Sequence, residues 1–198
     1  MKLIEIQNKL IESKLKVFSK LEFRRILQAT PISAQKLLER YTKRGVFVRL
    51  KGGLYALKTN YPSAYLIANK LYKPSYISFE TALSYYSIIP EVVYSYTSAT
   101  TRTTREFDVD NQIFLFHKLK KSAFAGYKLT EINGEKVLFA EPEKALADYL
   151  YYVFLKKKTL NDRMQTKNIN YEKLIYYTSL FDINKFSELV KNVITRTD

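Results

Sequence analysis

The chain has no cysteine and no tryptophan among its 198 residues, and its one histidine is His117. Without cysteine it can form neither a disulfide bond nor a zinc ribbon, and a single histidine makes a poor metal site. Its five glycines do not form the pattern of a phosphate-binding loop. We therefore expect no metal, no cofactor and no catalytic residues.

Long hydrophobic runs are also missing. No apolar stretch approaches the roughly 18 residues that a membrane-spanning helix needs. The first ten residues include Lys2, Glu5 and Lys9, so they lack the apolar core of a signal peptide. From these two absences we expect a cytoplasmic protein with no membrane partner.

Acidic residues are few relative to basic ones, and the imbalance is local. The chain carries 33 Lys and Arg against 19 Asp and Glu, a net charge of +14. Residues 1–60 hold 14 of the basic residues and 4 glutamates, a net charge of +10, which leaves +4 for residues 61–198. A basic balance favours nucleic acid as a partner, and its placement points to the first 60 residues.

A helix is expected to begin near Ser33, in the most informative stretch of the chain. Ser33 has the side chain of a helix N-cap, Ile32 can pack on Leu37 as a hydrophobic staple, and Gly45 suits the end of the helix. The apolar positions that repeat with helical spacing are Ala34, Leu37, Leu38 and Tyr41. The opposite face is rich in basic side chains.

A hairpin follows this helix at once, because two β-rich runs flank Gly52-Gly53. Two earlier helices are expected near residues 3–11 and after the capping box formed by Ser19 and Glu22. Three helices and a hairpin within about 58 residues are typical of a winged helix-turn-helix, whose third helix enters the major groove of DNA. The candidate DNA-binding residues are Ser33, Gln35, Lys36, Arg40, Lys43, Arg44, Arg49 and Lys51.

The residues after 60 predict a second, mixed α/β domain. The polar segment that ends at Pro62 suggests a boundary, so we expect a DNA-binding domain at 1–60 and the second domain at 61–198. Helices are expected near 63–71 and after Ser78, strands near 92–99 and 113–118, and a hairpin around Asn133-Gly134. A largely apolar helix at 142–155 and two closing helices from about 171 complete an α+β fold.

The most polar part of the second domain surrounds the start of the helix at 142–155. Glu141 and Glu143 suit its first turn, where the helix dipole favours acids. Lys144 and Asp148 stand four residues apart and can pair on one helix face. A metal-dependent nuclease would need separated carboxylates that converge, so we expect a polar seam that fixes the helix rather than a catalytic site.

Three segments resemble motifs of the AbiEi family of antitoxins, which are also described as predicted transcriptional regulators of viral defence systems. They are the hairpin at 49–55 (Arg-Leu-Lys-Gly-Gly-Leu-Tyr), residues 76–86, and residues 137–148, which contain Pro-Glu-Lys-Ala and then Asp. They occur in the family's order over residues 1 to about 155. On this resemblance Ser78, Glu143, Lys144 and Asp148 are the antitoxin-domain motif residues.

The resemblance implies a winged helix that represses its own operon by binding double-stranded DNA at promoter repeats. It also implies a second domain that counters a nucleotidyltransferase-like toxin, with or without a direct complex between the two proteins. Two alternatives stay open. One is a nucleic-acid-processing enzyme whose winged helix delivers substrate, and the other is a plain DNA-binding adaptor.

Overall fold

Three helices and a three-stranded sheet form the N-terminal part. The elements are α1 (Leu3–Glu12), β1 (Val17–Ser19), α2 (Lys20–Leu27), α3 (Pro31–Lys43), β2 (Phe47–Lys51), β3 (Leu54–Leu57) and the short 3-10 helix η1 (Lys58–Asn60). Strand β3 lies in the middle of this sheet, antiparallel to β1 on one side and to β2 on the other. The expected hairpin is confirmed, whereas β1 was not expected from the sequence.

The N-terminal core closes around aromatic side chains. Phe18 and Phe23 stack with ring centroids 5.6 Å apart, as a residue before the cap and one inside α2 should. Ser19 accepts a hydrogen bond from the Glu22 amide at 3.2 Å, and Glu22 accepts one from the Ser19 amide at 2.7 Å, which confirms the capping box. Phe47 from β2 packs edge-on against Phe18 and thereby joins the sheet to the helices.

Helix α3 begins three residues earlier than expected. Thr30 is its N-cap, because the Thr30 hydroxyl accepts from the Ser33 amide at 3.2 Å, and Pro31 takes the first helical position, where a missing N–H costs nothing. Ser33 is therefore not the cap but a residue of the first turn. The expected staple is also wrong, since the Ile32 side chain is 70% exposed.

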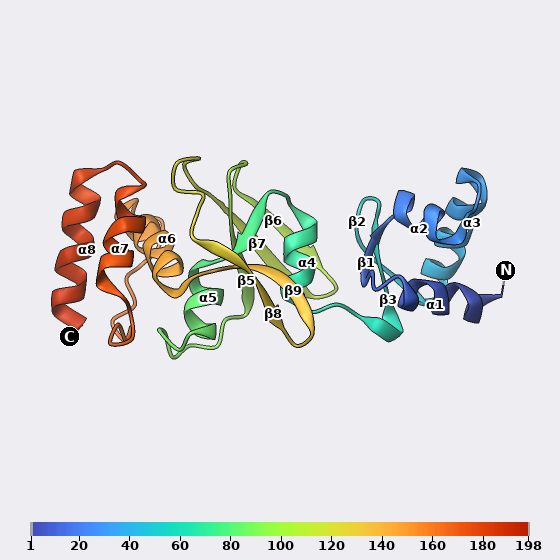
Figure 1. Cartoon of the computed structure of the whole chain (residues 1–198), viewed down its shortest axis with the longest axis horizontal. Coiled ribbons are helices and arrows are strands. Elements are labelled where there is room, and N and C mark those ends of the chain that lie inside the picture. Colours follow the sequence, from blue (N-terminus) through green and yellow to red (C-terminus); the bar gives the residue numbers. More distant parts are fainter. Residues whose placement is uncertain (1, 198) are drawn as a thin grey trace.

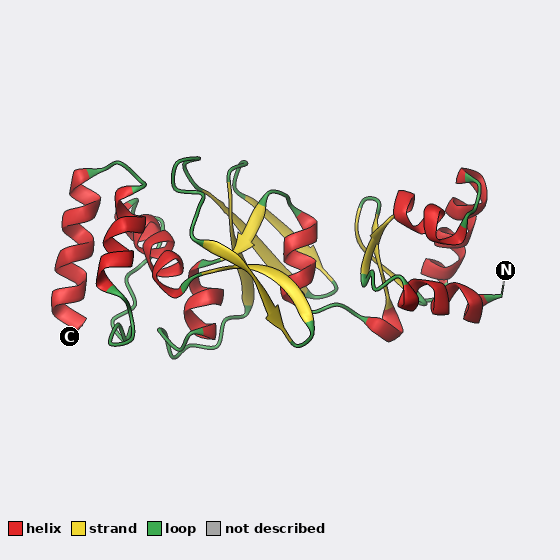
Figure 2. Cartoon of the chain, in the orientation of Figure 1, coloured by secondary structure: helices red, strands yellow, loops and turns green. Residues whose placement is uncertain are grey.

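The second part contains a six-stranded mixed sheet. Its elements are α4 (Ala64–Leu71), β4 (Ser75–Ile77), α5 (Phe79–Tyr85), β5 (Ser95–Thr100), β6 (Arg105–Val109), β7 (Gln112–Lys118), β8 (Tyr127–Ile132) and β9 (Glu135–Ala140). The strand order is β6-β7-β5-β4-β9-β8, with β5–β7 and β4–β9 parallel and the other pairs antiparallel. Figure 2 shows this sheet in the middle of the molecule. The turn at Asn133-Gly134 joins β8 to β9 as expected, with positive φ at both residues.

Three helices close the chain: α6 (Pro142–Phe154), α7 (Tyr171–Ser179) and α8 (Asn184–Thr197). As expected, Pro142 is the first residue of α6 and most of that helix is buried. Tyr151 of α6 lies 4.3 Å from Phe181, between α7 and α8, and 5.6 Å from Phe186 of α8, measured between ring centroids. These contacts pack the closing helices against α6. The chain is thus elongated, with the N-terminal part at one end and these helices at the other (Figure 1).

The structure is a computed structural model that describes the backbone of residues 2–197 and the side chains of residues 2–193. Within that range there are eight α-helices and two sheets, a mixed α+β fold. None of the described helices combines the length and the apolar composition that a bilayer span requires.

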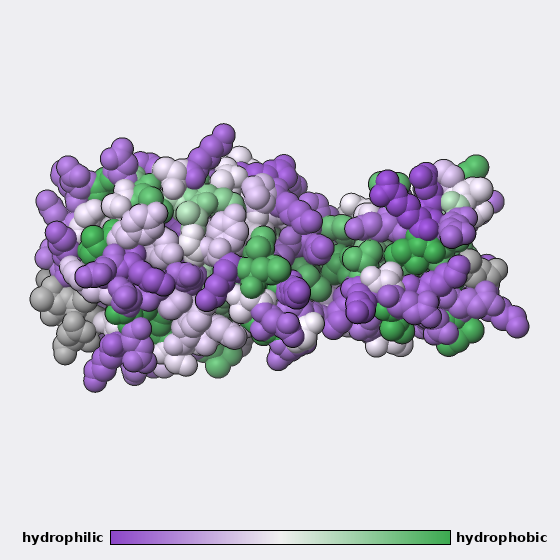
Figure 3. Space-filling view, viewed as in Figure 1, coloured by the Kyte–Doolittle hydropathy of each residue, from purple (hydrophilic) through white to green (hydrophobic). Residues whose placement is uncertain are grey.

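The two parts meet through apolar side chains. Val17, Leu50 and Ala56 of the smaller sheet are buried in the same cluster as residues of α4. Figure 3 shows hydrophobic side chains gathered at the narrow waist between the parts. An ion pair between Lys16 and Glu135, 2.7 Å from nitrogen to oxygen, lies at the same junction. The predicted boundary after residue 60 falls beside this waist, and independent folding of each part stays a prediction.

Candidate nucleic-acid interface

Helix α3 has one buried face and one exposed, basic face. Ala34, Leu38 and Tyr41 are buried in the N-terminal core, so the positions between them face outward. Most of the predicted DNA-binding residues are exposed on α3, at its C-terminal end or on the hairpin. They are Ser33, Gln35, Lys36, Arg40, Lys43, Arg44 and Arg49. Seven of the eight predicted DNA-binding residues therefore lie on the surface.

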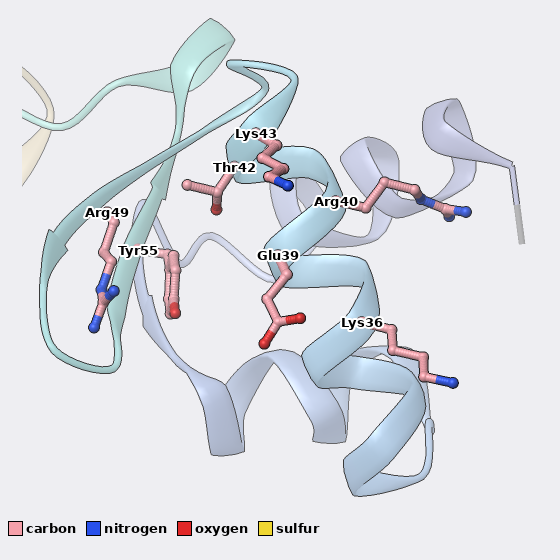
Figure 4. Close-up of a pocket in the computed structure, with 7 residues that line it drawn as sticks. All are labelled: Lys36, Glu39, Arg40, Thr42, Lys43, Arg49 and Tyr55. Atoms are coloured by element: carbon pink, nitrogen blue, oxygen red, sulfur yellow. The ribbon is translucent and has the colours of Figure 1, made fainter.

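A groove of about 570 Å³ runs between α3 and the hairpin β2–β3. Its lining consists of Lys36, Glu39, Arg40, Thr42, Lys43, Arg49 and Tyr55 (Figure 4). The helix supplies one wall and the strands supply Arg49 and Tyr55, which are cross-strand partners. The fold thus brings four of the predicted basic residues together around one hollow.

The Tyr41 ring, in the last turn of α3, lies close to two arginines, Arg40 of the helix and Arg44 at its C-cap. The Arg40 guanidinium carbon lies 4.8 Å from the centroid of the Tyr41 ring, and that of Arg44 lies 5.7 Å from it. An Arg40 nitrogen also donates to the Tyr41 hydroxyl at 3.3 Å. Because Tyr41 is itself buried, its ring is a fixed platform for both positive charges.

Lys51, the other predicted basic residue of the hairpin, does not line this groove. Residues two apart on a regular strand share a face, but the pairing of β2 with β3 shifts between Arg49 and Lys51, and their side chains diverge. The Lys51 amine donates to the Leu71 carbonyl at 2.8 Å, across the junction with the second part. Arg49 lines the groove beside α3, whereas Lys51 is turned away from it.

Glu39 lines the groove but was not predicted, because the prediction selected basic and polar residues for DNA contact. It is exposed in the middle of the basic face, and it accepts a hydrogen bond from the Gln35 side-chain amide at 2.8 Å. Among the described residues it forms no ion pair with the basic side chains around it. The four-residue spacing from Gln35 is the signal in the sequence that identifies this pair, and the hairpin register identifies Tyr55 opposite Arg49.

Three of the four antitoxin-domain motif residues meet inside the second part. Ser78 donates to one Asp148 carboxylate oxygen at 2.7 Å, and the other oxygen is paired with the Lys144 amine. Tyr76 adds a further hydrogen bond to Asp148 at 2.9 Å. Ser78, Lys144 and Asp148 are completely buried. The expected pairing of Lys144 with Asp148 is confirmed.

The Ser78 hydroxyl serves this cluster and not the start of α5. Ser78 does precede α5, but its side chain makes no capping hydrogen bond, because its hydroxyl is directed at Asp148. Burial raises the pKa of Asp148 and lowers that of Lys144, while their pairing opposes both shifts. The group therefore joins α5, β4 and α6 in a closed polar contact rather than an open site.

The glutamates at the start of α6 serve other contacts. Glu143 accepts a hydrogen bond from the Asn170 amide at 3.1 Å, and Glu141 accepts one from the Tyr177 hydroxyl at 2.9 Å. Both tie α6 to the segment that carries α7. Among the described side chains, no group of three or more His, Cys, Asp and Glu residues is placed to hold a metal ion.

The only histidine is enclosed by aromatic rings. His117 lies 4.8 Å from both Phe79 and Tyr152, measured between ring centroids. Neither ring nitrogen has a hydrogen-bond partner among the described residues. Burial, with the charges of Lys158 and Lys157, lowers the pKa of His117 to about 3. The ring is thus neutral at physiological pH and acts as a packing residue.

No protein-family model matches the chain, and no curated protein matches it.

Proposed function

We propose that this protein is a DNA-binding autorepressor and antitoxin, with a winged helix-turn-helix in its N-terminal part and an AbiEi-type domain after it. The observation that carries the DNA-binding half is the groove between α3 and the hairpin, where Lys36, Lys43 and Arg49 gather around one concave surface. Phosphate neutralisation by such side chains supplies nearly all of the non-specific affinity of proteins for DNA and a large share of the specific affinity.

The order of elements supports the winged-helix assignment. Helix, strand, two helices and two strands follow one another from α1 to β3, and the hairpin β2–β3 lies beside the exposed face of α3. In winged helices the third helix enters the major groove and the wing lies near the backbone. Residues on the exposed face of α3 would then reach base edges, and Arg49 would reach the phosphates.

The antitoxin half rests on the sequence resemblance. Three of the motif residues, Ser78, Lys144 and Asp148, contact one another in one buried cluster. Two motifs that are far apart in the sequence therefore depend on the same contact. The proposed functional partner is a nucleotidyltransferase-like toxin. A direct complex with it is not required by the proposal.

Binding of the purified chain to DNA from its own promoter region tests the repressor half. Changing Lys36 or Arg40 to alanine should weaken specific binding by about 1–3 kcal/mol if the side chain reads a base. Lys185 on α8 is exposed at the opposite end of the molecule, so Lys185→Ala is the matched control. Unchanged promoter affinity in both folded α3 variants would remove α3 from the interface.

Co-expression with the product of the neighbouring gene tests the antitoxin half. If that gene encodes a nucleotidyltransferase-like toxin, the full chain should restore growth. Promoter binding without growth rescue would favour the adaptor, and metal-dependent activity on nucleic acid would favour the processing enzyme.

A further inference from the structure

Three cations from both parts of the molecule converge on two touching aromatic rings. The rings of Tyr72 and Phe107 lie 5.8 Å apart, centroid to centroid. The Lys51 amine lies 4.7 Å from the Phe107 centroid and 5.7 Å from that of Tyr72. The Arg102 guanidinium lies 4.5 Å from the Tyr72 ring, and that of Arg105 lies 5.2 Å from the Phe107 ring. We call Lys51, Arg102 and Arg105 the junction cluster.

Chain geometry keeps carboxylates away from the junction cluster. Arg105 and Phe107 alternate with Glu106 and Asp108 along β6, so the two acids project from the other face of the strand. Within the described part of the chain, no carboxylate forms an ion pair with Lys51, Arg102 or Arg105. Three positive charges are therefore held close together without a counter-charge from the protein.

The aromatic rings and the backbone hold these charges in place. Lys51 is partly buried, and its amine is fixed on the carbonyl of Leu71, the last residue of α4, where the helix dipole favours a cation. Burial, followed by the charges of Arg105 and Arg102, lowers the pKa of Lys51. Both arginines are exposed, so an anion can reach them from solvent. A bound anion would relieve the mutual repulsion of the three cations.

The position of Lys51 connects the junction cluster to the α3 groove. Arg49 and Lys51 are separated by about 7 Å along β2, at roughly 3.3 Å per residue. Their side chains diverge, so Arg49 faces the groove while Lys51 reaches the second part, and the two charges together span the hairpin. Because Arg49 already lines the groove, a duplex seated there would continue along the hairpin toward the second part.

We propose that Lys51, Arg102 and Arg105 bind phosphates of the DNA backbone, so that the DNA interface crosses from the N-terminal part onto the second part of the chain. This inference rests on the proposed function and extends it, because the near-balanced charge of residues 61–198 gives no reason to expect such contacts. Guanidinium groups suit phosphate oxygens, and contacts of this kind position DNA without reading its sequence.

The test is the salt dependence of DNA binding by the full-length chain. Fluorescence anisotropy should be measured with the protein's own promoter duplex and with an unrelated duplex, over a series of salt concentrations. In the double variant Arg102→Ala/Arg105→Ala the slope of log K against log salt should fall in magnitude by about 2, equally for both duplexes. The double variant Arg102→Lys/Arg105→Lys should keep most of the slope, because it keeps the charges.

A matched control removes two exposed charges elsewhere. Lys167 lies before α7 and Lys185 lies on α8, so changing both to alanine should leave the slope unchanged. If the wild type binds DNA and the double arginine-to-alanine variant, folded by circular dichroism, keeps the full slope, the junction cluster is not part of the interface and the proposed function stands. If the wild type binds neither duplex, the proposed function itself fails and this inference fails with it.

A free phosphate group is the competing source of the same chemistry. Thermal unfolding should be followed with inorganic phosphate and with chloride at matched ionic strength. Stabilisation by phosphate that the double alanine variant loses, together with an unchanged DNA salt slope, would assign the junction cluster to a small phosphate ligand and overturn the DNA assignment. Loss of the slope without phosphate-specific stabilisation supports the backbone contact.

Discussion

The hydroxyl of Ser78 donates a hydrogen bond of 2.7 Å to the carboxylate of Asp148, seventy residues further along the chain. Tyr76 donates to the same oxygen, and Lys144 neutralises the charge from one turn away on α6. All four residues are buried. A buried charge with all of its hydrogen-bond and ion-pair partners fixes the side chains around it in one arrangement. A buried charge that lacks a partner costs unfolding free energy.

Removing one member of this pair should therefore destabilise the fold strongly. Asp148→Ala leaves the Lys144 amine buried without its counter-charge and should cost about 3–5 kcal/mol of unfolding free energy in urea denaturation. The double variant Lys144→Met/Asp148→Leu should cost less than Asp148→Ala alone. As a control, Glu91→Ala breaks an ion pair with Arg163, whose side chain is 72% exposed, and should cost far less unfolding free energy than Asp148→Ala. A similar small loss for Asp148→Ala would contradict the proposed role of the pair.

Gly126 lies beside the same cluster and should tolerate no side chain. Its φ is +72°, and a Cβ there would lie 2.5 Å from the Tyr177 ring and 2.9 Å from Lys144 Cγ. Gly126→Ala should cost about 1–3 kcal/mol from overpacking, in addition to the backbone strain. Gly134 has a similar φ of +75° with open space around it, so Gly134→Ala measures the strain alone. Equal losses of unfolding free energy in the two variants would show that the close approach is unimportant.

The enclosed ring of His117 should leave a signature in the dependence of stability on pH. Because its folded-state pKa is about 3 and the usual value is near 6.5, the unfolded chain binds the proton first as the pH falls. This contribution to stability is complete above about pH 6.5 and should decrease toward pH 3, at up to roughly 1.4 kcal/mol per pH unit.

Nuclear magnetic resonance isolates this group, since the chain has one histidine. The imidazole proton signals of the folded protein should not titrate between pH 8 and pH 5. In His117→Phe the decrease in stability below pH 6.5 should be shallower than in the wild type, whatever the absolute change in stability. An ordinary titration near pH 6.5 in the folded state would show that the ring is open to water.

Sequence periodicity predicted most elements that depend on local signals. The capping box at Ser19, the Asn133-Gly134 turn and the proline at the start of α6 all lie where expected, because short-range geometry decides them. Strands β1, β4 and β6 were missed. β1 and β4 are each three residues long and form only because long-range pairing satisfies them, β1 with β3, and β4 with β5 and β9. β6 is different, because it pairs locally with β7 across Asp110-Asn111, where both residues have positive φ.

The candidate site shows the same division between local and long-range effects. The exposed face of α3 follows from helical spacing, so Lys36, Arg40 and Lys43 were predictable. The direction of Lys51 was not, because it depends on the irregular strand pairing and on the carbonyl of Leu71 in another part of the chain. Ser78 was placed correctly before α5, but its partner Asp148 is distant in sequence, so its hydrogen bond could not be inferred from spacing.

Glu39 should influence which DNA sequence is bound more than how tightly DNA is bound. A carboxylate in a basic groove repels phosphate, but it can accept a hydrogen bond from the amino group of cytosine in the major groove. DNA selected from a random pool by the wild type should show a base preference that Glu39→Ala loses, at about 1–3 kcal/mol of discrimination.

Two further variants complete that test. Gln35→Ala removes the amide that holds the Glu39 carboxylate and should weaken the same preference. Glu12 is exposed on α1, outside the groove, so Glu12→Ala should leave the selected sequence unchanged. If Glu39→Ala selects the same sequence and only binds it more tightly, the Glu39 carboxylate repels phosphate and contacts no base.

The division of labour between the two parts gives the last prediction. The second part has its own sheet and its own buried cluster around Asp148, so residues 62–198 should fold alone, lose promoter binding and still relieve the toxicity of the neighbouring gene product. Residues 1–60 should bind DNA and give no protection. Because Leu50 and Ala56 are buried in the same cluster as residues of α4, the larger fragment should be less stable than the intact chain. Circular dichroism must show that each fragment is folded before growth is scored.

Full-length variants make the same test without exposing the junction. Lys36→Ala combined with Lys43→Ala should abolish repression of a promoter reporter, since both side chains line the α3 groove, and should leave growth rescue intact. Asp148→Ala should impair rescue, because it loosens the contact between α5 and α6. Loss of rescue in the folded Lys36/Lys43 variant would mean that protection depends on DNA binding, and the two-function proposal would then give way to a single function of repression.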